Sequence, residues 1–305
     1  MTQIEVTFLG TTAGVPTKER SHPAVSIKYR SENEYNFLFD CGEGTQRQIL
    51  HTDINFMRIN DIFITHWHAD HFAGLLGLFE TMNLEGRTKA LNIYGPEAQR
   101  FVDILQELGY SSKKYEIVAH DAWFEGISPQ ILLDNEEFQL LSIPVKHSIP
   151  AVAYAFAEKD RVKIDKTKSK AAGLPAKGPI YREIKEKGSV IWKEKKIKLE
   201  DIALVERGKK VVYSGDTMPC KNIITISKNA DILIHDSTFF EDETDENYRH
   251  SNFDEVIRIA KEANAKQLVL THISRRYQNA EDIKEKIKGY ENVKIAKDLM
   301  KLVVR

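Results

Sequence analysis

The sequence predicts an α/β fold built in layers, because short apolar runs alternate along the 305 residues with stretches whose apolar positions recur at helical spacing. Hydrophobic residues make up 42% of the chain, enough to bury one large domain or one domain with a sizeable insertion. The sequence shows no internal repeat and no long Gly/Ser-rich or Pro-rich linker. We therefore expect a single domain over residues 1–305.

Seven apolar runs have the length of strands, and polar residues of chemical interest follow them closely. These runs are Ile4–Leu9, Phe37–Phe39, Ile62–Ile64, Leu140–Val145, Val211–Tyr213, Ile232–Ile234 and Leu268–Leu270. Five other stretches place apolar residues three or four positions apart, as on one face of a helix. They are Thr45–His51, Phe72–Met82, Pro96–Leu108, Phe253–Ala263 and Ala280–Lys288.

Positive charge is concentrated in one segment, although the formal net charge of the chain is only −1. Residues 148–215 contain 17 Lys and Arg against 9 Asp and Glu, a net charge of +8, so the remainder carries −9. Within this segment Gly173–Pro179 can be neither regular helix nor central strand, because proline lacks an N–H and fixes φ. We expect residues 156–198 to project from the core, although a charge run can also be a solvated surface without function.

The composition argues against several classes of protein. Only two cysteines occur, Cys41 and Cys220, so a disulfide framework is not expected and both are interpreted as reduced thiols. No run approaches a membrane span of roughly 20 apolar residues, and Met1–Gly10 has the pattern of a strand without a basic leader. We therefore expect a cytoplasmic protein without membrane contact, and with two isolated cysteines any metal site would have to use histidine and carboxylate ligands.

The strongest signal is a cluster of four potential metal ligands within six residues, placed between the apolar run Ile62–Ile64 and a helical stretch. It reads Thr65-His66-Trp67-His68-Ala69-Asp70-His71. A tight loop from a strand to a helix can aim His66 and His68 to one side and Asp70 and His71 to another. This spacing is highly specific and suits two adjacent metal ions.

Three more candidate ligands repeat this topology, since His147, Asp216 and His272 each follow an apolar run. Ligands in layered α/β folds bind outside the carboxyl ends of strands. Taken singly, a His or Asp at a strand end is more often a cap or a turn residue. Together with the loop cluster they make seven ligands, which is what two metal ions with one bridging carboxylate require.

These residues resemble the metallo-β-lactamase superfamily, which is marked by a His-x-His-x-Asp-His loop followed by His, Asp and His ligands in that order. The resemblance reaches from residue 1 to about residue 275 and implies an αββα sandwich with the metals at one edge between the sheets. It also implies that one zinc ion binds His66, His68 and His147, and the other Asp70, His71 and His272, with Asp216 bridging. Two adjacent metal ions activate a water molecule and stabilise the attacking and leaving oxygens of an in-line displacement. The metals alone therefore do not distinguish between phosphodiesters, thioesters and lactams as substrates.

Further motifs resemble the ribonuclease Z family within this superfamily. They are Phe8–Arg20, which contains Gly10-Thr11-Thr12-Ala13-Gly14-Val15-Pro16-Thr17-Lys18, then Asp40-Cys41-Gly42-Glu43-Gly44-Thr45-Gln46, Ser214-Gly215-Asp216-Thr217 and Thr271-His272-Ile273-Ser274-Arg275-Arg276-Tyr277. The combination is more specific than any single motif. It implies a zinc-dependent endoribonuclease that cuts precursor tRNA on the 3′ side of the discriminator, leaving a 3′-hydroxyl on the tRNA and a 5′-phosphate on the trailer.

The resemblance also indicates the groups that transfer protons. His235-Asp236-Ser237-Thr238-Phe239, followed by His250-Ser251, corresponds to a block that usually carries glutamate where this chain has Asp236. We interpret His250 as the general acid for the leaving 3′-oxygen, oriented by Asp236 if this shorter carboxylate reaches it. The alternative is an exposed loop histidine. Asp70 is interpreted both as a zinc ligand and as the acceptor of a proton from the attacking water.

The basic segment resembles the flexible arm with which ribonuclease Z grips the elbow of tRNA, and phosphate contacts there would hold the substrate. The residues predicted to contact RNA are Lys18, Arg20, Lys166, Lys168, Lys170, Gly173, Pro175, Lys177, Gly178 and Pro179. The family resemblance further implies a two-fold homodimer. His22, His51, His120 and His235 fit no ligand position and are interpreted as structural or surface residues.

Three other functions explain part of the sequence. A thioesterase of the glyoxalase II type would use the same ligands but would leave the basic segment without a role. A flavodiiron oxidoreductase would need more carboxylate at the metals and a flavin domain. A catalytically inactive RNA-binding relative is disfavoured because every ligand position is filled. Zinc is the metal expected for histidine-rich ligation, although manganese or iron can substitute at oxygen-containing positions.

Overall fold

The computed structural model describes residues 2–108, 114–240, 249–277 and 280–305. The chain divides into two compact units, of which the first combines Met1–Ala157 with Lys209–Arg305 and the second is Glu158–Gly208. In the described residues, no helix combines the length and the apolar character that crossing a bilayer requires.

Two seven-stranded sheets form the first unit. The first has the order β20 (Lys301–Val304), β1 (Gln3–Gly10), β3 (Ala24–Arg30), β4 (Glu34–Phe39), β5 (Asp61–Phe63), β6 (Leu91–Gly95) and β7 (Ile117–Asp121). The second has the order β19 (Val293–Ile295), β17 (Leu268–Thr271), β16 (Ile232–Asp236), β15 (Lys210–Tyr213), β10 (Val152–Glu158), β9 (Phe138–Pro144) and β8 (Gln130–Asp134). Two short strands, β2 (Thr12–Ala13) and β18 (Ile273–Ser274), pair with each other in parallel.

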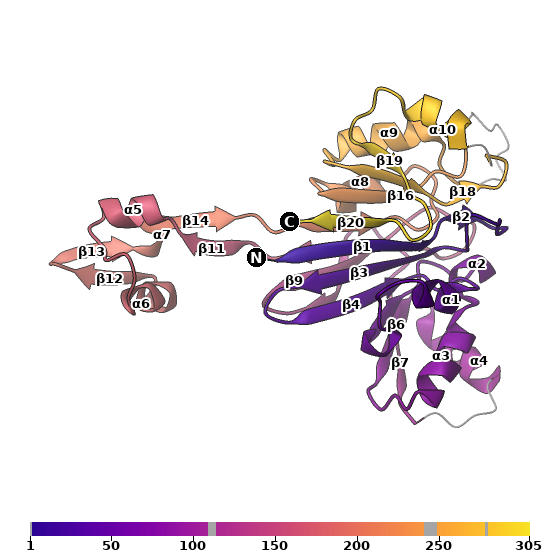
Figure 1. Cartoon of the computed structure of the whole chain (residues 1–305), viewed down its shortest axis with the longest axis horizontal. Coiled ribbons are helices and arrows are strands. Elements are labelled where there is room, and N and C mark those ends of the chain that lie inside the picture. The colour runs from indigo at the N-terminus through magenta and orange to yellow at the C-terminus, as the bar shows by residue number, and fades with distance from the viewer. Residues whose placement is uncertain (1, 109–113, 241–248, 278–279) are drawn as a thin grey trace. The chain divides into compact units, whose positions relative to one another are not determined.

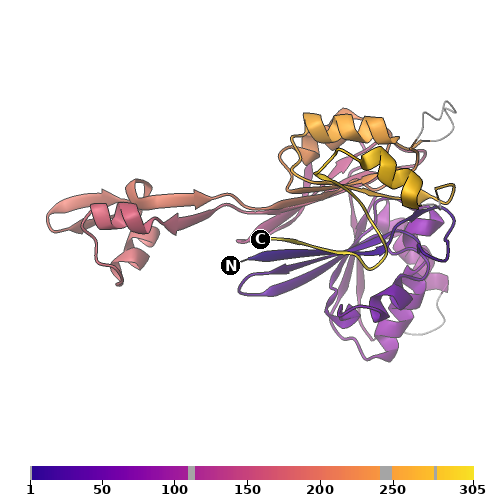
Figure 2. The ribbon, with the colours of Figure 1, turned by 45° about the horizontal axis from the view of Figure 1, so that its top comes forward.

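Helices cover the outer face of each sheet, so the unit has four layers in the order αββα (Figures 1 and 2). The first sheet carries α1 (Thr45–Leu50), the 3-10 helix η1 (Phe56–Arg58), α2 (Ala69–Phe72), α3 (Leu75–Leu84) and α4 (Ala98–Leu108). The second carries α8 (Lys221–Ser227), α9 (Phe253–Glu262) and α10 (Ala280–Ile287). The sandwich predicted from the metallo-β-lactamase resemblance is confirmed.

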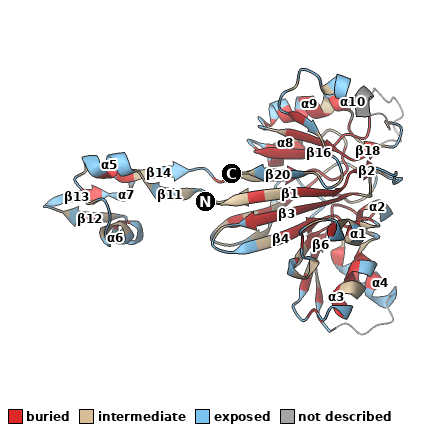
Figure 3. Ribbon diagram, viewed as in Figure 1, coloured by how far each residue is buried: buried red, intermediate tan, exposed pale blue. Residues whose placement is uncertain are grey.

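Three apolar clusters hold these layers together, and Figure 3 shows the sheets as the most buried part of the unit. The cluster between the two sheets is rich in aromatic rings, and Phe63 stacks on Tyr94 with the ring centroids 4.7 Å apart. Burial of each such side chain contributes roughly 1.5–3 kcal/mol. The inner faces of both sheets are therefore dry, and polar chemistry is left to the sheet edges.

Parallel pairing brings the ends of the predicted strands to a common edge. Strands β4 to β7 are parallel to one another, as are β15, β16, β17 and β19, so their carboxyl ends align within each sheet. All seven strands predicted from apolar runs are present. The other strands of the two sheets were not among the predicted runs, although the alternation of apolar and polar residues in β3 is itself typical of a strand. These strands are β3, β6, β7, β8, β10, β19 and β20.

Four of the five predicted helices are present within about two residues of their predicted bounds, but the prediction of one helix over Phe72–Met82 is wrong. The chain instead forms α2 and α3 on either side of Gly74. The turn between them bonds to Cys41, whose N–H donates to the His71 carbonyl at 2.7 Å and whose carbonyl accepts from Gly74 at 2.9 Å. A Cβ at residue 74 would lie 2.3 Å from the carbonyl oxygen of Gly42, so this close approach requires glycine.

The second unit is a small α/β structure with its own apolar cluster. Its elements are β11 (Arg161–Ile164), α5 (Lys166–Ala171), α6 (Ile180–Lys187), β12 (Ser189–Trp192), β13 (Lys195–Lys198), α7 (Leu199–Ile202) and β14 (Ala203–Glu206). The cluster contains Leu174, Ile184, Val190, Ile197 and Ile202. The unit extends past residue 198 because β14 pairs with β11. Gly173–Pro179 forms neither helix nor strand, as predicted from its prolines and glycines.

Candidate metal centre

Four of the predicted ligands form one group at the edge of the sandwich. The Nδ1 atom of His68 lies 3.0 Å from His66 Nε2 and 3.1 Å from His147 Nε2. Asp216 Oδ2 lies 3.6 Å from His66 Nε2 and 4.0 Å from His147 Nε2. Ligand atoms around a tetrahedral zinc ion with bonds near 2.1 Å are about 3.4 Å apart. These four atoms therefore have the spacing of one metal site.

The remaining predicted ligands form a second group around the same aspartate oxygen. Asp216 Oδ2 lies 3.4 Å from His71 Nε2 and 3.3 Å from His272 Nε2. Asp70 Oδ2 is 3.6 Å from each of these histidine nitrogens. Asp216 Oδ2 thus lies within 4.0 Å of histidine nitrogens in both groups, as the oxygen of a bridging ligand would.

Buried polar atoms without protein partners test whether a cation fits this cluster. Within the described residues, His71 Nε2, His272 Nε2 and Asp216 Oδ1 are buried and have no hydrogen-bond partner. Such unsatisfied atoms are costly in a protein interior and call for an ion or another partner. Histidine and carboxylate together form the donor set of divalent metals such as zinc. The cluster therefore fits a divalent metal centre.

The histidine pKa values are lowered in the first group and raised in the second. Burial lowers the pKa of His66 well below its ordinary value and also lowers the pKa of His68 and His147, which favours neutral rings with free lone pairs. Burial alone would lower the pKa of His71 and His272, but neighbouring carboxylates together outweigh it and raise both pKa values. These carboxylates are Asp216 and Asp40 for His71, and Asp216, Asp236 and Asp70 for His272. The carboxylates around His71 and His272 therefore favour positive charge in the second group, and a bound cation would supply it.

Local geometry sets the positions of the ligands. His272 has a φ of 57° and Asp40 a φ of 55°, both in the left-handed region that costs a non-glycine residue roughly 1–3 kcal/mol. Gly215, next to Asp216, also has a positive φ, and a Cβ there would lie 2.6 Å from the Thr65 Cβ. Such strain persists only where the surroundings enforce it, and it occurs here directly at the ligand loops.

Asp40 is a site residue that the sequence analysis did not single out. Its buried carboxylate accepts hydrogen bonds from Thr65 N at 2.8 Å and from the Tyr213 hydroxyl at 2.8 Å, and its Oδ2 lies 2.7 Å from His71 Nδ1. This contact fixes the His71 ring so that Nε2 faces the ligand group. Asp40 directly follows β4, and the rule applied to His66 and His147 would have found it.

Asp236 reaches His250 despite being one methylene shorter than glutamate. Asp236 Oδ2 is 2.9 Å from His250 Nδ1, and its Oδ1 accepts from the Thr238 hydroxyl at 2.6 Å. The Thr238 hydroxyl lies 2.9 Å from His272 Nδ1, so one carboxylate braces two histidines. Burial lowers the pKa of His250, but the carboxylates of Asp236 and Asp216 outweigh burial and raise it. The protonated ring, which can act as an acid, is favoured.

The predicted RNA contacts lie in both units. In the first, Lys18 is exposed, whereas the Arg20 guanidinium donates to the Thr11 hydroxyl at 2.6 Å and to the Ala296 carbonyl at 2.8 Å. Arg20 lines a pocket of about 370 Å³ together with Thr17, Glu19, Ser274, Arg275, Tyr277, Lys297 and Asp298. This pocket has three basic side chains next to the β2–β18 pair, which leads directly to His272.

In the second unit all four predicted lysines are exposed, and the loop between α5 and α6 is braced by aromatic side chains. These lysines are Lys166, Lys168, Lys170 and Lys177, and the loop contains Gly173, Pro175, Gly178 and Pro179. The Tyr181 hydroxyl donates to the Pro175 carbonyl, and the Trp192 indole N–H donates to the Gly173 carbonyl at 2.9 Å. The unit thus presents its cations to solvent around a hydrogen-bonded loop.

The four histidines predicted to have no ligand role lie outside both groups. His22 Nε2 is 3.1 Å from the Gly14 carbonyl, and His120 stacks on Tyr94. His235 is buried with Nδ1 2.7 Å from the Asp236 carbonyl, and His51 is exposed at the end of α1.

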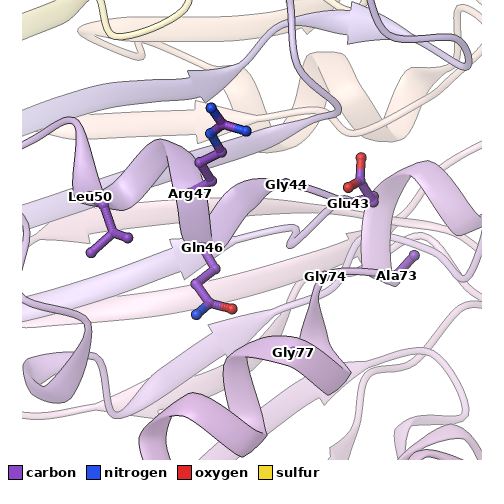
Figure 4. A pocket seen from close by; sticks show the side chains of 8 residues that line it. All are labelled: Glu43, Gly44, Gln46, Arg47, Leu50, Ala73, Gly74 and Gly77. Carbon is purple, nitrogen blue, oxygen red and sulfur yellow. The ribbon is translucent and has the colours of Figure 1, made fainter.

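A separate pocket of about 310 Å³ lies between α1 and α3 (Figure 4). Its lining is Glu43, Gly44, Gln46, Arg47, Leu50, Ala73, Gly74 and Gly77. None of these eight residues belongs to the ligand groups, so this hollow is distinct from the metal centre.

Two family models match parts of the chain. The model described as Anti-Pycsar protein Apyc1 matches residues 4–109, and the Beta-lactamase superfamily domain matches residues 201–273. Human tRNase Z, short form, has a crystal structure that superposes with a TM-score of 0.70 at 28% identity, covering 98% of each chain. The metallo-beta-lactamase fold protein YhfI from Bacillus subtilis has a TM-score of 0.66 at 22% identity, which supports the fold alone.

Curated relatives match almost the full length. The ribonuclease Z of Archaeoglobus fulgidus is 40% identical over 313 residues, covering 98% of this chain and 97% of that protein. The ribonuclease Z of Methanosarcina acetivorans is 38% identical over 308 residues, covering 99% and 98%. Identity at this level over whole chains, together with the fold and the ligand clusters, shows that the chain belongs to the ribonuclease Z family of metallo-β-lactamase-fold hydrolases.

Proposed function

We propose that this chain is a two-zinc endoribonuclease that cuts precursor tRNA on the 3′ side of the discriminator, leaving a 3′-hydroxyl on the tRNA and a 5′-phosphate on the trailer. The observation that carries the proposal is the convergence of seven candidate ligands, whose histidines on both sides lie within 4.0 Å of Asp216 Oδ2, with His250 held on Asp236 beside them. Family membership supports the choice of RNA as substrate.

His66, His68 and His147 would hold one zinc ion, Asp70, His71 and His272 the other, and Asp216 would bridge them. Two bound zinc ions supply a hydroxide near neutral pH and neutralise charge on the phosphate. The residues of the chain orient this chemistry, since Asp40 braces the His71 ring and Thr238 braces the His272 ring.

Two residues would move protons. Asp70 accepts a proton from the attacking water, and its Oδ2 is held in place by the Gly14 N–H at 3.1 Å. His250 donates a proton to the leaving 3′-oxygen, since its Nδ1 is engaged by Asp236 and its Nε2 remains for the substrate. Asp236 acts through His250 by fixing its orientation and favouring its protonated form.

The second unit would bind the body of the tRNA away from the scissile phosphate. Residues 158–208 contain 15 Lys and Arg against 9 Asp and Glu, and the four lysines around α5 and its loop are exposed. Contacts of exposed lysines with phosphates give affinity without reading sequence. Lys18 and Arg20 would add phosphate contacts near the metal centre. A thioesterase of small molecules has no use for this charge, so we favour RNA.

Dimer formation and a cytoplasmic location stay predictions. A two-fold dimer would let one protomer bind the tRNA body while its partner cuts. Analytical ultracentrifugation that shows only monomer at assay concentrations would remove this part of the proposal.

The direct test is cleavage of an end-labelled precursor tRNA by the purified protein, with its metal content measured in parallel. We expect about two zinc ions per chain, a single cut after the discriminator, and loss of cleavage after treatment with a chelator followed by recovery with zinc. Products that end in a 2′,3′-cyclic phosphate, or full activity of metal-free protein, would reject this mechanism.

A further inference from the structure

The loop that follows β7 exposes three large apolar side chains in a short stretch. Trp123 is 62% exposed, Phe124 37% and Ile127 80%, whereas the neighbouring Ala122 is buried. Single exposed apolar residues are ordinary, but an aromatic pair with an isoleucine on one loop marks a contact surface.

Hydrogen bonds hold this loop in one conformation. The Ala122 N–H donates to the Gly95 carbonyl at 2.8 Å, and the Trp123 N–H donates to Gln130 Oε1 at 2.7 Å. Further along, Asn222 Nδ2 donates to the Gly126 carbonyl at 3.0 Å. The backbone is therefore bonded at Ala122 and Trp123, at the start of the loop, and at Gly126 in its middle. A rigid loop presents a ring with little loss of conformational entropy on binding.

The bonds of this loop to Gly95 and to Asn222 connect it to the segments that carry candidate metal ligands. Strand β7 is parallel to β6, and β6 to β5, so the loop leaves the sheet at the same edge as the loop carrying His66 and His68. Gly95 is followed by Pro96, whose carbonyl accepts the indole N–H of Trp67 between these two histidines. Asn222 also donates to the Pro144 carbonyl at 2.9 Å, three residues before His147. The exposed apolar residues thus lie on a loop at the same edge of the first sheet as the ligand loop, two strands away from β5.

We propose that Trp123, with Phe124 and Ile127 beside it, stacks on an unpaired nucleobase of the RNA next to the scissile phosphate. This inference rests on the function proposed above. A nucleotide whose phosphate lies at the metal centre is pulled out of regular stacking, and its base then needs a new apolar partner. Aromatic rings accept any base because every base has a flat π face. The site would therefore grip single-stranded RNA without reading its sequence.

The test compares Trp123→Ala and Trp123→Phe with the wild type, with Leu84→Ala as matched control because Leu84 is 83% exposed at the end of α3. On precursor tRNA we expect Trp123→Ala to raise KM about tenfold with a much smaller change in kcat, and Trp123→Phe to recover most of the affinity. Leu84→Ala should leave KM unchanged. Metal content per chain should equal that of the wild type in all three variants.

Precursors with a single abasic nucleotide on either side of the cut identify the stacked base. At one position the abasic substrate should raise KM for the wild type and add nothing further for Trp123→Ala, because both changes remove the same contact. Equal KM values for wild type and Trp123→Ala, loss of metal from Trp123→Ala, or a changed oligomeric state with additive abasic effects would each overturn the inference. Failure of the wild type to cut any precursor would instead reject the proposed function.

Discussion

The metal-centre edge of the first unit and the basic second unit use charged side chains in opposite ways. At the metal centre His66 and His71 are fully buried, and Asp216 is 3% exposed. In the second unit many charged side chains lie in solvent, and exposed ions pair with each other, as Lys187 does with Glu183 on a helix and Lys163 with Glu206 across two strands. The first region places charges where water is excluded, and the second places them where water surrounds them.

This difference follows from what each region has to do. Buried ionisable groups cost several kcal/mol unless each has a partner, so the metal centre requires a second layer that includes Asp40, Thr238 and Asp236. Exposed lysines need no such layer, and their attraction to phosphates adds up over many weak contacts. Substitutions in the first region should therefore act steeply and individually, whereas those in the second should act weakly and additively.

The largest effect is expected from Asp216→Ala, because the Oδ2 atom of this carboxylate lies within 4.0 Å of histidine nitrogens in both ligand groups. Cleavage of precursor tRNA should fall by at least about a thousandfold, with fewer than two metal ions per chain, and His68→Ala should also abolish cleavage. Metal analysis and single-turnover assays measure both. Asp103→Ala, an exposed aspartate on α4, is the control. A variant at Asp216 that kept two metals and normal turnover would end the two-site scheme.

Next in size is His250→Ala, which removes the proposed acid without removing a ligand. We expect kcat to fall by about 10²–10⁴ with little change in KM, since the lost proton transfer matters only as the leaving oxygen gains charge. His51→Ala changes an exposed histidine and should behave as the wild type. Steady-state kinetics on the same precursor decide the matter, and unchanged turnover would return His250 to the role of a surface histidine.

A smaller effect should follow Asp40→Asn, which keeps the shape but removes the charge that holds His71. We expect metal affinity or activity to fall about 10- to 100-fold, as is usual when the partner of a ligating histidine is lost. Competition with a chelator of known affinity measures this effect. Asp298→Asn is a suitable control, because Asp298 accepts from Thr11, Ser21 and Gln48 but contacts no ligand. Equal metal affinities for the two variants would contradict the bracing role.

The sequence predicted seven strands and singled out seven candidate ligands that the fold brings together, because both leave local signals. Each ligand follows an apolar run, and the spacing from His66 to His71 is itself specific. Asp40 also follows an apolar run, but its role in bracing His71 was not predicted, because its partners Thr65, His71 and Tyr213 are distant in sequence and only the fold brings them to it. The break at Gly74 was missed for the same reason, since a long-range bond to Cys41 outweighs local helical periodicity.

In the second unit the sequence predicted the irregular loop but not the strand pairing or the contacts that hold it. Its proline and glycine pattern predicted an irregular loop, but charge composition alone did not reveal that β14 returns to pair with β11. Nor did it show that Tyr181 and Trp192 brace the loop, because single aromatic residues in a lysine-rich stretch carry no periodicity.

A moderate, substrate-selective effect is expected when the lysines of the second unit are neutralised. Changing Lys166, Lys168, Lys170 and Lys177 to Gln should weaken precursor binding on the order of tenfold, and each lost phosphate contact should reduce the salt slope by roughly one unit. Hydrolysis of a nitrophenyl phosphodiester should persist, because that substrate needs only the metal centre. A matched control neutralises four exposed lysines of the first unit, Lys89, Lys228, Lys261 and Lys294. If both quadruple variants lost the same affinity for the precursor, the effect would come from the total charge of the protein and not from the second unit. If the second-unit variant lost activity on both substrates in parallel, the lysines would support folding and not RNA binding.

The smallest effect concerns surface ion pairs, where removing a less exposed pair of the first unit should cost more stability than removing a more exposed pair of the second. In the first unit Glu34, 28% exposed, accepts from Arg30 at 3.0 Å and from Arg58 at 3.2 Å, and the hydrogen bond from Arg30 is the main cause that lowers the pKa of Glu34 to about 2. Because the folded-state pKa lies below the ordinary value of 4.5, this stabilisation is complete above about pH 4.5 and disappears as pH falls towards 2. Glu34→Gln should therefore lower the free energy of unfolding by about 1 kcal/mol at pH 7.

Glu183→Gln in the second unit makes the matching change at a more exposed pair on helix α6. It should cost only about 0.3–0.5 kcal/mol, as is typical of a helical pair four residues apart. Urea unfolding of both variants at pH 7 and near pH 3 measures the difference. The Glu34 effect should shrink at the lower pH, because the unfolded chain takes up a proton at its ordinary pKa of 4.5 while the folded carboxylate still resists protonation. A pH-independent loss at Glu34 would mean that the side chain stabilises by packing, and the contrast between the two units would then be one of burial alone.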